Sequence, residues 1–417
     1  MGLPVWELVR LIGRAIPQTF ANLDFLLVML LVLFLIYGQY RRVAVMETIV
    51  LGSAYTNPLT ETTTAMVYGL IGGILASVVF IGVGIPLSET GIWYVWPLAL
   101  LLMLIHPRFL CFSYAGGILA LSHLVFRWPT LNVAAIMALV AVLHLVEAAL
   151  IRMHGHLAPS PVYIRGEEGE VVGGLSLQKF WPLPILALVM VAVTGELEGA
   201  DLIAMPDWWP LIRPYQTPGE GKKFLYLLFP MVAALGYGDI CLSRLPKKKA
   251  KLASFYLVSY SLALLGIAIG AATRPLLQWV AALGAPLGHE LVIYLGRQSE
   301  RTHPPLFSAK HGAMILAVQP GSPAETMGLL PGDIIIAIND YPVSSSEDVR
   351  EVMVPWVIDP TIRVRGTISG KGDRVIEYKG KIPPLGVVFV PDPHEQRALV
   401  LRREGLLARW LKRRRDH

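Results

Sequence analysis

Long apolar stretches separated by short polar ones run through the first two-thirds of the chain. A helix that crosses a membrane needs about 20 mostly apolar residues, and about eight stretches reach or approach that length. They are residues 23–40, 65–87, 92–105, 109–126, 131–151, 183–197, 224–242 and 252–272, of which the third and the sixth are short. The pattern predicts a polytopic α-helical membrane domain over residues 21–297.

Two flanking segments depart from this pattern. Residues 1–20 place Glu7, Arg10 and Arg14 on one helical face, opposite apolar residues, which indicates an amphipathic helix at the membrane interface. Residues 276–295 are apolar, but a cluster of glycine and proline interrupts them. This ninth stretch is compatible with a span, a re-entrant pair or an interfacial helix.

Composition supports a membrane protein. Hydrophobic residues make up 54% of the chain and charged residues 16%, which does not fit an average soluble protein. The two cysteines, Cys111 and Cys241, lie inside apolar stretches, so no disulfide framework is predicted. The net charge of +6 is concentrated in short loops and near the C-terminal end. It therefore indicates membrane orientation and contact with anionic lipid, and no nucleic-acid partner is predicted.

Two basic clusters bear on orientation. The strongest cluster between spans consists of Arg244 and residues 247–251, and the positive-inside rule places it in the cytoplasm. Residues 393–417 form a basic amphipathic tail that suits the anionic lipid of the cytoplasmic leaflet. Both clusters favour a cytoplasmic C-terminal domain, with an even number of crossings between the first cluster and that domain.

The hydrophobic pattern of the chain changes after about residue 298, where the long apolar stretches end. Short β-rich runs at residues 314–318, 334–338, 362–367 and 375–378 are separated by glycine, proline and aspartate turns. Residues 346–354 read as a helix that begins at a serine cap. We therefore expect a small α+β domain over residues 298–392.

The run GAMILAVQPGSPAETMGLLPGDIIIAINDYPV at residues 312–343 closely resembles a PDZ domain. Its parts have physical reasons, because Gly321 permits a tight turn, Ser322 caps a short helix and Gly328 closes that helix. PDZ domains bind an extended peptide by adding it as a strand beside a helix. The resemblance implies the same mode of binding here.

The groove helix of such a domain would be residues 346–354. Its apolar face offers Val349, Val352 and Met353 as peptide-binding candidates. Backbone hydrogen bonds along the groove would supply affinity, and side-chain pockets would supply choice of peptide.

The loop that binds the peptide carboxylate has two candidate positions. Leu385, Gly386 and Val387 form an apolar-glycine-apolar turn after the other strands, which suits the permuted strand order of bacterial PDZ domains. Gly312 and Ala313 are the competing position.

One motif raises the question of intramembrane proteolysis. Zinc proteases of this kind need two histidines at positions i and i+4 of a helix, with a glutamate beside the first. The sequence HELVI supplies His289 and Glu290, but Ile293 occupies the second position. We therefore expect no enzyme activity, and no catalytic residue, cofactor or metal site is predicted.

Three ionisable residues lie inside apolar stretches. His144 and Glu147 share a helical face, and Asp239 lies in the predicted seventh span. Ionisable groups at membrane depth are costly, so they serve either as polar contacts between helices or as an ion or proton path. The sequence leaves both interpretations open.

Four membrane motifs complete the picture: HPRFLCFSYAGG at 106–117, MPDWWPL at 205–211, LGYGDI at 235–240 and PLGHEL at 286–291. With the PDZ run, they resemble the MinJ family of bacterial division-topology proteins over nearly the whole chain. The resemblance implies a membrane scaffold enriched at septum and poles, which links a DivIVA-like pole protein to a MinD-like division inhibitor. The alternatives are a PDZ-containing regulator or subunit of a membrane protease or transporter and, third, a transporter that uses the three ionisable residues.

Overall fold

The computed structural model describes residues 3–165, 170–194, 203–308, 312–353, 358–368, 370–380 and 384–391. Within these ranges, five helices are long and apolar enough to cross a membrane. They are α2 (Leu23–Leu51), α3 (Pro58–Val83), α6 (Val133–Met153), α7 (Pro246–Ala271) and α8 (Pro275–Arg301). A further helix, α1 (Val5–Ala21), precedes them at the predicted amphipathic segment. The predicted polytopic helical membrane domain is thus confirmed, with five long helices in place of about eight spans.

The ninth stretch is one continuous helix. Helix α8 runs through Pro286 without a break. A proline inside a helix removes one backbone hydrogen bond, but packing against neighbouring helices tolerates it. Here the Pro286 ring packs on α5 (Phe112–Phe126), where a Cβ added to Gly117 would lie 2.7 Å from Pro286 Cδ. The re-entrant alternative for residues 276–295 is therefore wrong, and α8 is long and apolar enough to cross a membrane.

The predicted third and fourth spans are two half-length helices. Helix α4 (Ile92–Ile105) has 14 residues and α5 has 15, so each is only about 21–23 Å long, short of a bilayer core. The 3-10 helices η1 (Leu87–Glu89) and η2 (Pro107–Leu110) lie before α4 and between the two helices. Asn132, which follows α5, donates its backbone N–H to the carbonyl of Glu89, which precedes α4, at 2.9 Å. The pair therefore enters and leaves the bundle at the same end as a re-entrant hairpin.

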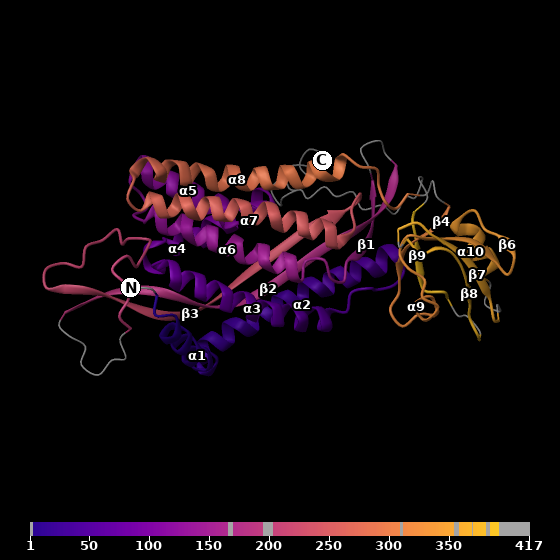
Figure 1. Cartoon of the computed structure of the whole chain (residues 1–417), viewed down its shortest axis with the longest axis horizontal. Helices are drawn as coiled ribbons and strands as arrows, with labels where there is room; N and C mark the ends of the chain where they lie inside the picture. The colour runs from indigo at the N-terminus through magenta and orange to yellow at the C-terminus, as the bar shows by residue number, and fades with distance from the viewer. Residues whose placement is uncertain are drawn as a thin grey trace, which may run out of the picture.

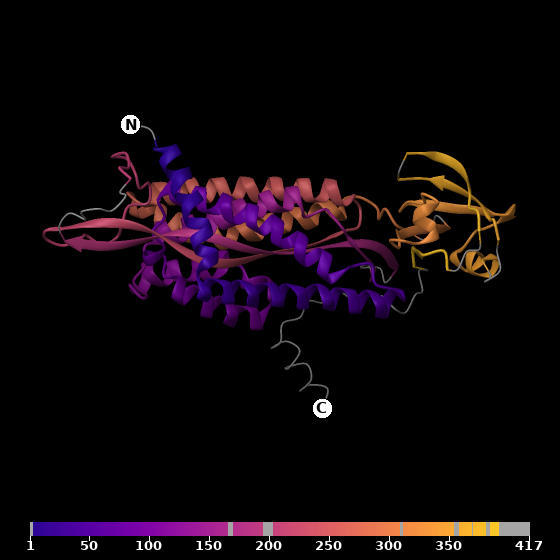
Figure 2. The same cartoon turned by 90° about the horizontal axis from the view of Figure 1, so that it is seen from below.

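The predicted sixth and seventh spans are strands, and the span assignment was wrong there. Strands β1 (Ser160–Arg165), β2 (Val171–Thr194) and β3 (Lys222–Cys241) form an antiparallel sheet in the order β1-β2-β3. The register of β2 and β3 runs from Leu175↔Cys241 to Thr194↔Lys222. This long hairpin lies along the helices and projects beyond them at one end of the molecule (Figures 1 and 2).

Two prolines explain why this apolar run is not helical. Pro182 and Pro184 in β2 lack a backbone N–H, and they lie past the end of β1, where the outer edge of β2 has no partner strand among the described residues. Helix α3 covers that edge instead. The next backbone N–H along it, from Leu186, is satisfied by the Ser77 hydroxyl at 2.8 Å.

Small residues let α3 approach this strand closely. A Cβ added to Gly69 would lie 2.0 Å from the Pro182 carbonyl oxygen, and one added to Gly73 would lie 2.1 Å from that of Pro184. Lys179 of β2 is also buried there, with its Nζ 2.7 Å from Glu61 Oε2 on α3. The strand is therefore held by close backbone contact and by a buried ion pair.

The C-terminal domain lies at the end of the bundle opposite the hairpin tip (Figure 1). We call these the domain end and the hairpin end. Glu300, in the last turn of α8, accepts the backbone N–H groups of Leu242 and Ser243, just before α7. Its Oε1 also lies 3.5 Å from Nζ of Lys249, which is buried in the first turns of α7. The basic cluster that opens α7 and the C-terminal domain therefore lie at the same end, two long helices apart.

The C-terminal domain is a small antiparallel sheet with two short helices. Its strands are β4 (Ala313–Val318), β5 (Asp333–Ile338), β6 (Tyr341–Pro342), β7 (Thr361–Gly366), β8 (Gly372–Glu377) and β9 (Val387–Phe389). The sheet order is β8-β7-β5-β4-β9, with β6 paired to β5. Helices α9 (Pro323–Thr326) and α10 (Ser346–Val352) complete it. The four predicted strands and the groove helix are confirmed to within a few residues.

The two domains are in contact. The backbone N–H of Leu306 donates to the Leu242 carbonyl at 2.8 Å, and that of Gly173 donates to the Phe307 carbonyl at 3.1 Å. The Tyr163 hydroxyl of β1 donates to the carbonyl of Phe389 in β9 at 3.0 Å. The chain after α8 thus adds to the membrane sheet before it enters the C-terminal domain. The predicted tail at 393–417 lies outside the described residues.

Candidate functional sites

The first candidate site is the edge of the C-terminal sheet at β9. This strand ends the sheet order and pairs with β4 on one side. In an antiparallel strand, consecutive residues point their backbone groups alternately to the two sides. The backbone groups of Gly386 and Val390 bond to Gln319 and Met314 on the β4 side, so Val387 and Phe389 present theirs to the outer edge. An added peptide strand would use such groups.

The predicted turn at Leu385, Gly386 and Val387 stands at the start of β9. The Leu385 and Gly386 carbonyls accept the backbone N–H groups of Ala324 at 3.0 Å and Gln319 at 2.8 Å. Gly386 has a φ of 78°, and a Cβ there would lie 2.2 Å from that of Ser322. Only glycine fits this position. The turn is therefore fixed against the start of α9.

The competing position, Gly312 and Ala313, lies at the other end of β4. Val318 of β4 pairs with Val387, whereas Ala313 lies beyond the residue, Ile315, that pairs with Phe389. Ala313 is buried in the core, and Gly312 packs against the Ser344 carbonyl. The two candidate positions for carboxylate binding are thus separated by the length of β4, and both stay predictions.

In the predicted groove helix α10, one apolar residue lies in the domain core and two lie at its margin. Val349 is 3% exposed and belongs to the domain core, while Val352 and Met353 are half-buried at its margin. A capping box of Ser345 and Asp348 begins the helix. Hydrogen bonds from Ser344 and Ser345 lower the pKa of Asp348 to about 2. The Asp348 carboxylate therefore stays charged and caps the helix down to a lower pH than an ordinary aspartate would.

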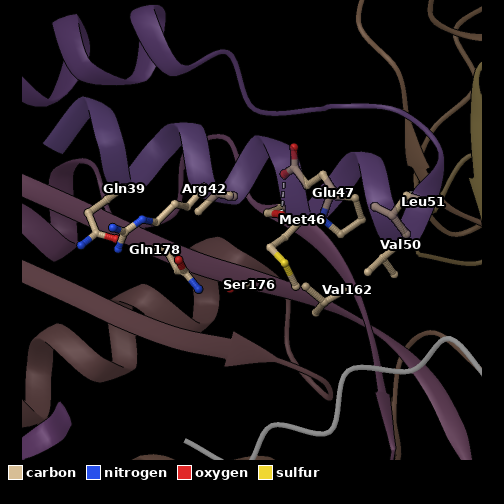
Figure 3. A pocket seen from close by; sticks show the side chains of 12 residues that line it. Gln39, Arg42, Met46, Glu47, Val50, Leu51, Val162, Ser176 and Gln178 are labelled. Atoms are coloured by element: carbon tan, nitrogen blue, oxygen red, sulfur yellow. Dashed lines mark hydrogen bonds between the residues drawn. The ribbon is translucent and has the colours of Figure 1, made fainter. Parts of the chain in front are cut away.

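A pocket of about 240 Å³ with mixed apolar and polar lining lies between α2 and strands β1 and β2 (Figure 3). Gln39 and Arg42 line it from α2, and Gln178 lines it from β2. Glu47 at its side accepts hydrogen bonds from the backbone of Tyr55 and Thr56 and from the Ser160 hydroxyl. Its carboxylate is thus occupied in joining three segments of the chain.

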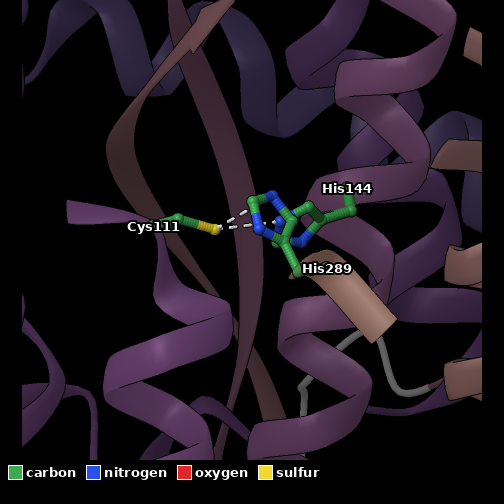
Figure 4. A group of neighbouring side chains, drawn as sticks. All are labelled: Cys111, His144 and His289. Carbon is green, nitrogen blue, oxygen red and sulfur yellow. Dashed lines mark hydrogen bonds between the residues drawn. The ribbon is translucent and has the colours of Figure 1, made fainter. Parts of the chain in front are cut away.

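A second candidate site lies in the middle of the helix bundle. Cys111, just before α5, His144 of α6 and His289 of α8 point toward one another (Figure 4). Cys111 Sγ lies 3.1 Å from His144 Nε2 and 3.8 Å from His289 Nε2. The three candidate ligand atoms all lie within 4.8 Å of one another, which makes this a group that could hold a metal ion.

Sequence reasoning missed this cluster. Along the chain, His289 belongs to the HELVI motif, His144 shares a helical face with Glu147, and Cys111 is a cysteine in an apolar stretch. The three residues come from separate elements, so no spacing along the chain could have revealed them. The two membrane motifs that contain Cys111 and His289 were the available signal.

Of the other two ionisable residues predicted at membrane depth, Asp239 makes a contact between elements, whereas the role of Glu147 is not assigned. Asp239 lies in β3, and its Oδ2 lies 3.3 Å from Nζ of Lys249, which is 2% exposed. With Glu300 it forms a charged triad around the buried Lys249 that joins β3, α7 and α8, which fits a contact between elements. Glu147 lies about one helical turn beyond His144 on the same face of α6.

Comparison with known proteins agrees with this architecture. The model of the PDZ domain family matches residues 314–353, which span β4 to the end of α10. This match confirms the predicted PDZ domain. Together with the five long apolar helices, it defines the chain as a multi-pass membrane protein with a PDZ domain near its C-terminal end.

The chain is also similar to the cell division topological determinant MinJ of Bacillus subtilis (strain 168). The two sequences are 26% identical over 281 residues, which cover 65% of this chain and 64% of that protein. The match thus spans slightly less than two thirds of the relative. It confirms the resemblance to MinJ that the membrane motifs and the PDZ run indicated.

Proposed function

We propose that the chain is a non-enzymatic membrane scaffold that recruits or bridges division-site placement proteins through its PDZ groove. The observation that carries this proposal is the outer edge of β9, which begins at a glycine turn and presents backbone groups away from β4. A C-terminal or extended peptide would add to this edge, and its affinity would come from backbone hydrogen bonds. The half-buried Val352 and Met353 are the groove-helix residues best placed to contact its side chains.

The similarity to MinJ supports the choice of partners. That relative is named as a topological determinant of cell division. By resemblance, the partners of this chain would be DivIVA-like and MinD-like proteins, with anionic membrane lipid at the basic tail. No enzyme activity is part of the proposal, because a scaffold acts by bringing its partners together at the membrane.

The charge pattern supports a cytoplasmic location of the PDZ domain. The domain lies at the same end as the basic start of α7, and positive loops stay inside. In intact cells, a cysteine at Glu347, whose side chain is 68% exposed, should resist a membrane-impermeant thiol reagent. A cysteine at the exposed Glu220 of the hairpin end should react. Labelling of position 347 with protection of position 220 would show that the PDZ domain lies outside the cell. Cytosolic proteins could then not be its direct partners.

The scaffold role is tested by location. A fluorescent fusion of the full chain should concentrate at septa and poles of dividing rod-shaped cells, and deletion of the gene should produce minicells or elongated cells. A uniform membrane signal with normal division would contradict the proposal. That outcome would favour the alternative of a PDZ-containing regulator of a membrane protease or transporter.

A further inference from the structure

The cluster of Cys111, His144 and His289 lies where irregular backbone reaches the middle of the bundle. Helices α4 and α5 enter and leave at the hairpin end, so residues 106–111 between them form the deep tip of the re-entrant pair. His144 and His289 lie near the midpoints of α6 and α8. Non-helical backbone at such depth is tolerated only where protein buries it or where it lines a cavity. Here it presents a cysteine to two histidines.

Hydrogen bonds fix the orientation of both imidazoles. His144 Nδ1 lies 2.7 Å from the Val140 carbonyl, which can only accept, so Nδ1 carries the proton of the neutral ring. Tyr114 donates its hydroxyl to Glu290 Oε1 at 2.8 Å, so it accepts from His289 Nδ1 at 3.2 Å. In both rings, Nε2 is left with a lone pair that faces the thiol.

This arrangement gathers three lone-pair atoms around one point. Among these atoms only the Cys111 thiol carries a proton, and it can be donated to one histidine at a time. A cation that displaced the proton would contact all three. Histidine ligands of metals commonly donate their other ring N–H to a carbonyl or a carboxylate-linked group, as both do here.

We infer that Cys111, His144 and His289 bind a zinc ion. In tetrahedral zinc sites, Zn–S bonds are about 2.3 Å and Zn–N bonds about 2.0–2.1 Å, so sulfur and nitrogen ligands lie about 3.6 Å apart. The observed Sγ–Nε2 distances of 3.1 and 3.8 Å lie on either side of this value. Small side-chain movements would bring all three atoms to bonding distance.

The types of ligand atom at the site favour zinc over other common metal ions. One thiolate and two imidazoles suit zinc, whereas magnesium, calcium and manganese prefer oxygen ligands. The Cys111 thiolate supplies one of the two negative charges that neutralise Zn²⁺, which lowers the cost of the cation at membrane depth. Cys111 and His289 are half-buried, and His144 is buried.

Bound zinc would join three elements that are distant in sequence. It would tie the tip of the re-entrant pair to α6 and α8, and α8 leads directly into the PDZ domain. The site would therefore stabilise the bundle on which that domain is mounted. This role is independent of which peptide the groove binds.

Metal content of the full chain tests the inference. The protein, purified in detergent with an affinity tag that lacks histidine, should contain about one zinc per chain by elemental analysis, because three protein ligands with a water in the fourth position hold zinc in proteins. Cys111→Ser and His289→Ala should each lower the zinc content at least tenfold. Cys241→Ala and His156→Ala are the matched controls, since both residues lie outside the cluster, and they should keep the zinc.

A spectroscopic readout separates ligand loss from misfolding. Protein loaded with Co²⁺ should show a thiolate-to-cobalt charge-transfer band that Cys111→Ser loses and Cys241→Ala retains, with both variants eluting as wild type in size exclusion. Zinc below a tenth of an equivalent after growth in zinc-supplemented medium would overturn the inference. So would zinc that persists in both ligand variants, or copper in place of zinc.

Discussion

The two sheets of this protein end at their outer edges in different ways. In the membrane domain, helix α3 covers the outer edge of β2, where two prolines have no N–H to offer and Ser77 satisfies the N–H of Leu186. In the PDZ domain, no strand among the described residues pairs with the outer edge of β9. The Phe389 carbonyl there accepts a side-chain hydrogen bond from Tyr163 of β1, which an added strand would have to displace. A covered edge holds a fold together, whereas an open edge can accept a strand. The difference fits a structural role for the first sheet and supports our proposal that the second binds partners.

The largest effect should come from separating α3 from β2. In Gly73→Ala, the new methyl group would lie 2.1 Å from the Pro184 carbonyl oxygen, which belongs to backbone and cannot move away cheaply. We expect little folded protein in the membrane. Gly82→Ala is the matched control, because no atom lies within 4 Å of a Cβ at that position of the same helix. Equal yields of the two variants, measured by size exclusion in detergent, would show that α3 does not hold this edge.

The next effect concerns buried charge. Lys179→Met leaves Glu61 without its partner, and loss of one member of a buried pair costs roughly 3–5 kcal/mol. The melting temperature of the full chain should fall markedly, and Glu61→Gln added to it should restore part of the loss. Arg350→Ala breaks the exposed pair with Glu347 on α10 and should change stability by less than about 1 kcal/mol. Equal effects of the two single substitutions would contradict the contrast between a packed and an exposed region.

The smallest effect should come from the contact between the two sheets. Tyr163→Phe removes the hydroxyl that donates to Phe389, and a neutral hydrogen bond contributes about 1 kcal/mol. The rate of amide hydrogen exchange in β4 should rise by about fivefold at most, because about 1 kcal/mol changes an opening equilibrium by that factor. Tyr341→Phe, at a side chain that is 66% exposed, should leave exchange in β4 unchanged. Exchange that is identical in the two variants would mean that Tyr163 does not restrain the PDZ domain.

The PDZ domain could be predicted from sequence because its signals are local. Gly321 and Gly328 take positive φ angles, and Ser322 caps α9, each as the run of residues 312–343 indicated. The short strands β6 and β9 and their pairing needed the structure. Turn residues at fixed offsets therefore predicted this domain closely.

The membrane domain was predicted less well because apolar runs carry no period. Residues 183–197 and 224–242 are apolar enough for helices, and such a run does not separate a buried strand from a buried helix. Pro182 and Pro184 were the local signal against a helix, and the facing glycines of α3 lie about a hundred residues earlier in the chain. The Cys111, His144 and His289 cluster likewise depends on contacts between distant elements.

The central claim is that the open edge beside α10 is the surface through which this scaffold binds its partners. Val352→Glu places a carboxylate at the half-buried margin of α10, where it would wet the groove and repel a peptide carboxylate, while the core residue Val349 stays intact. Val375→Glu is the matched control on β8, at the opposite edge of the sheet, where the side chain is 60% exposed. The measurement is septal enrichment and cell length at matched membrane levels of full-length protein. Val352→Glu should lose septal enrichment and lengthen cells while Val375→Glu behaves as wild type, and septal enrichment that survives Val352→Glu would contradict the claim.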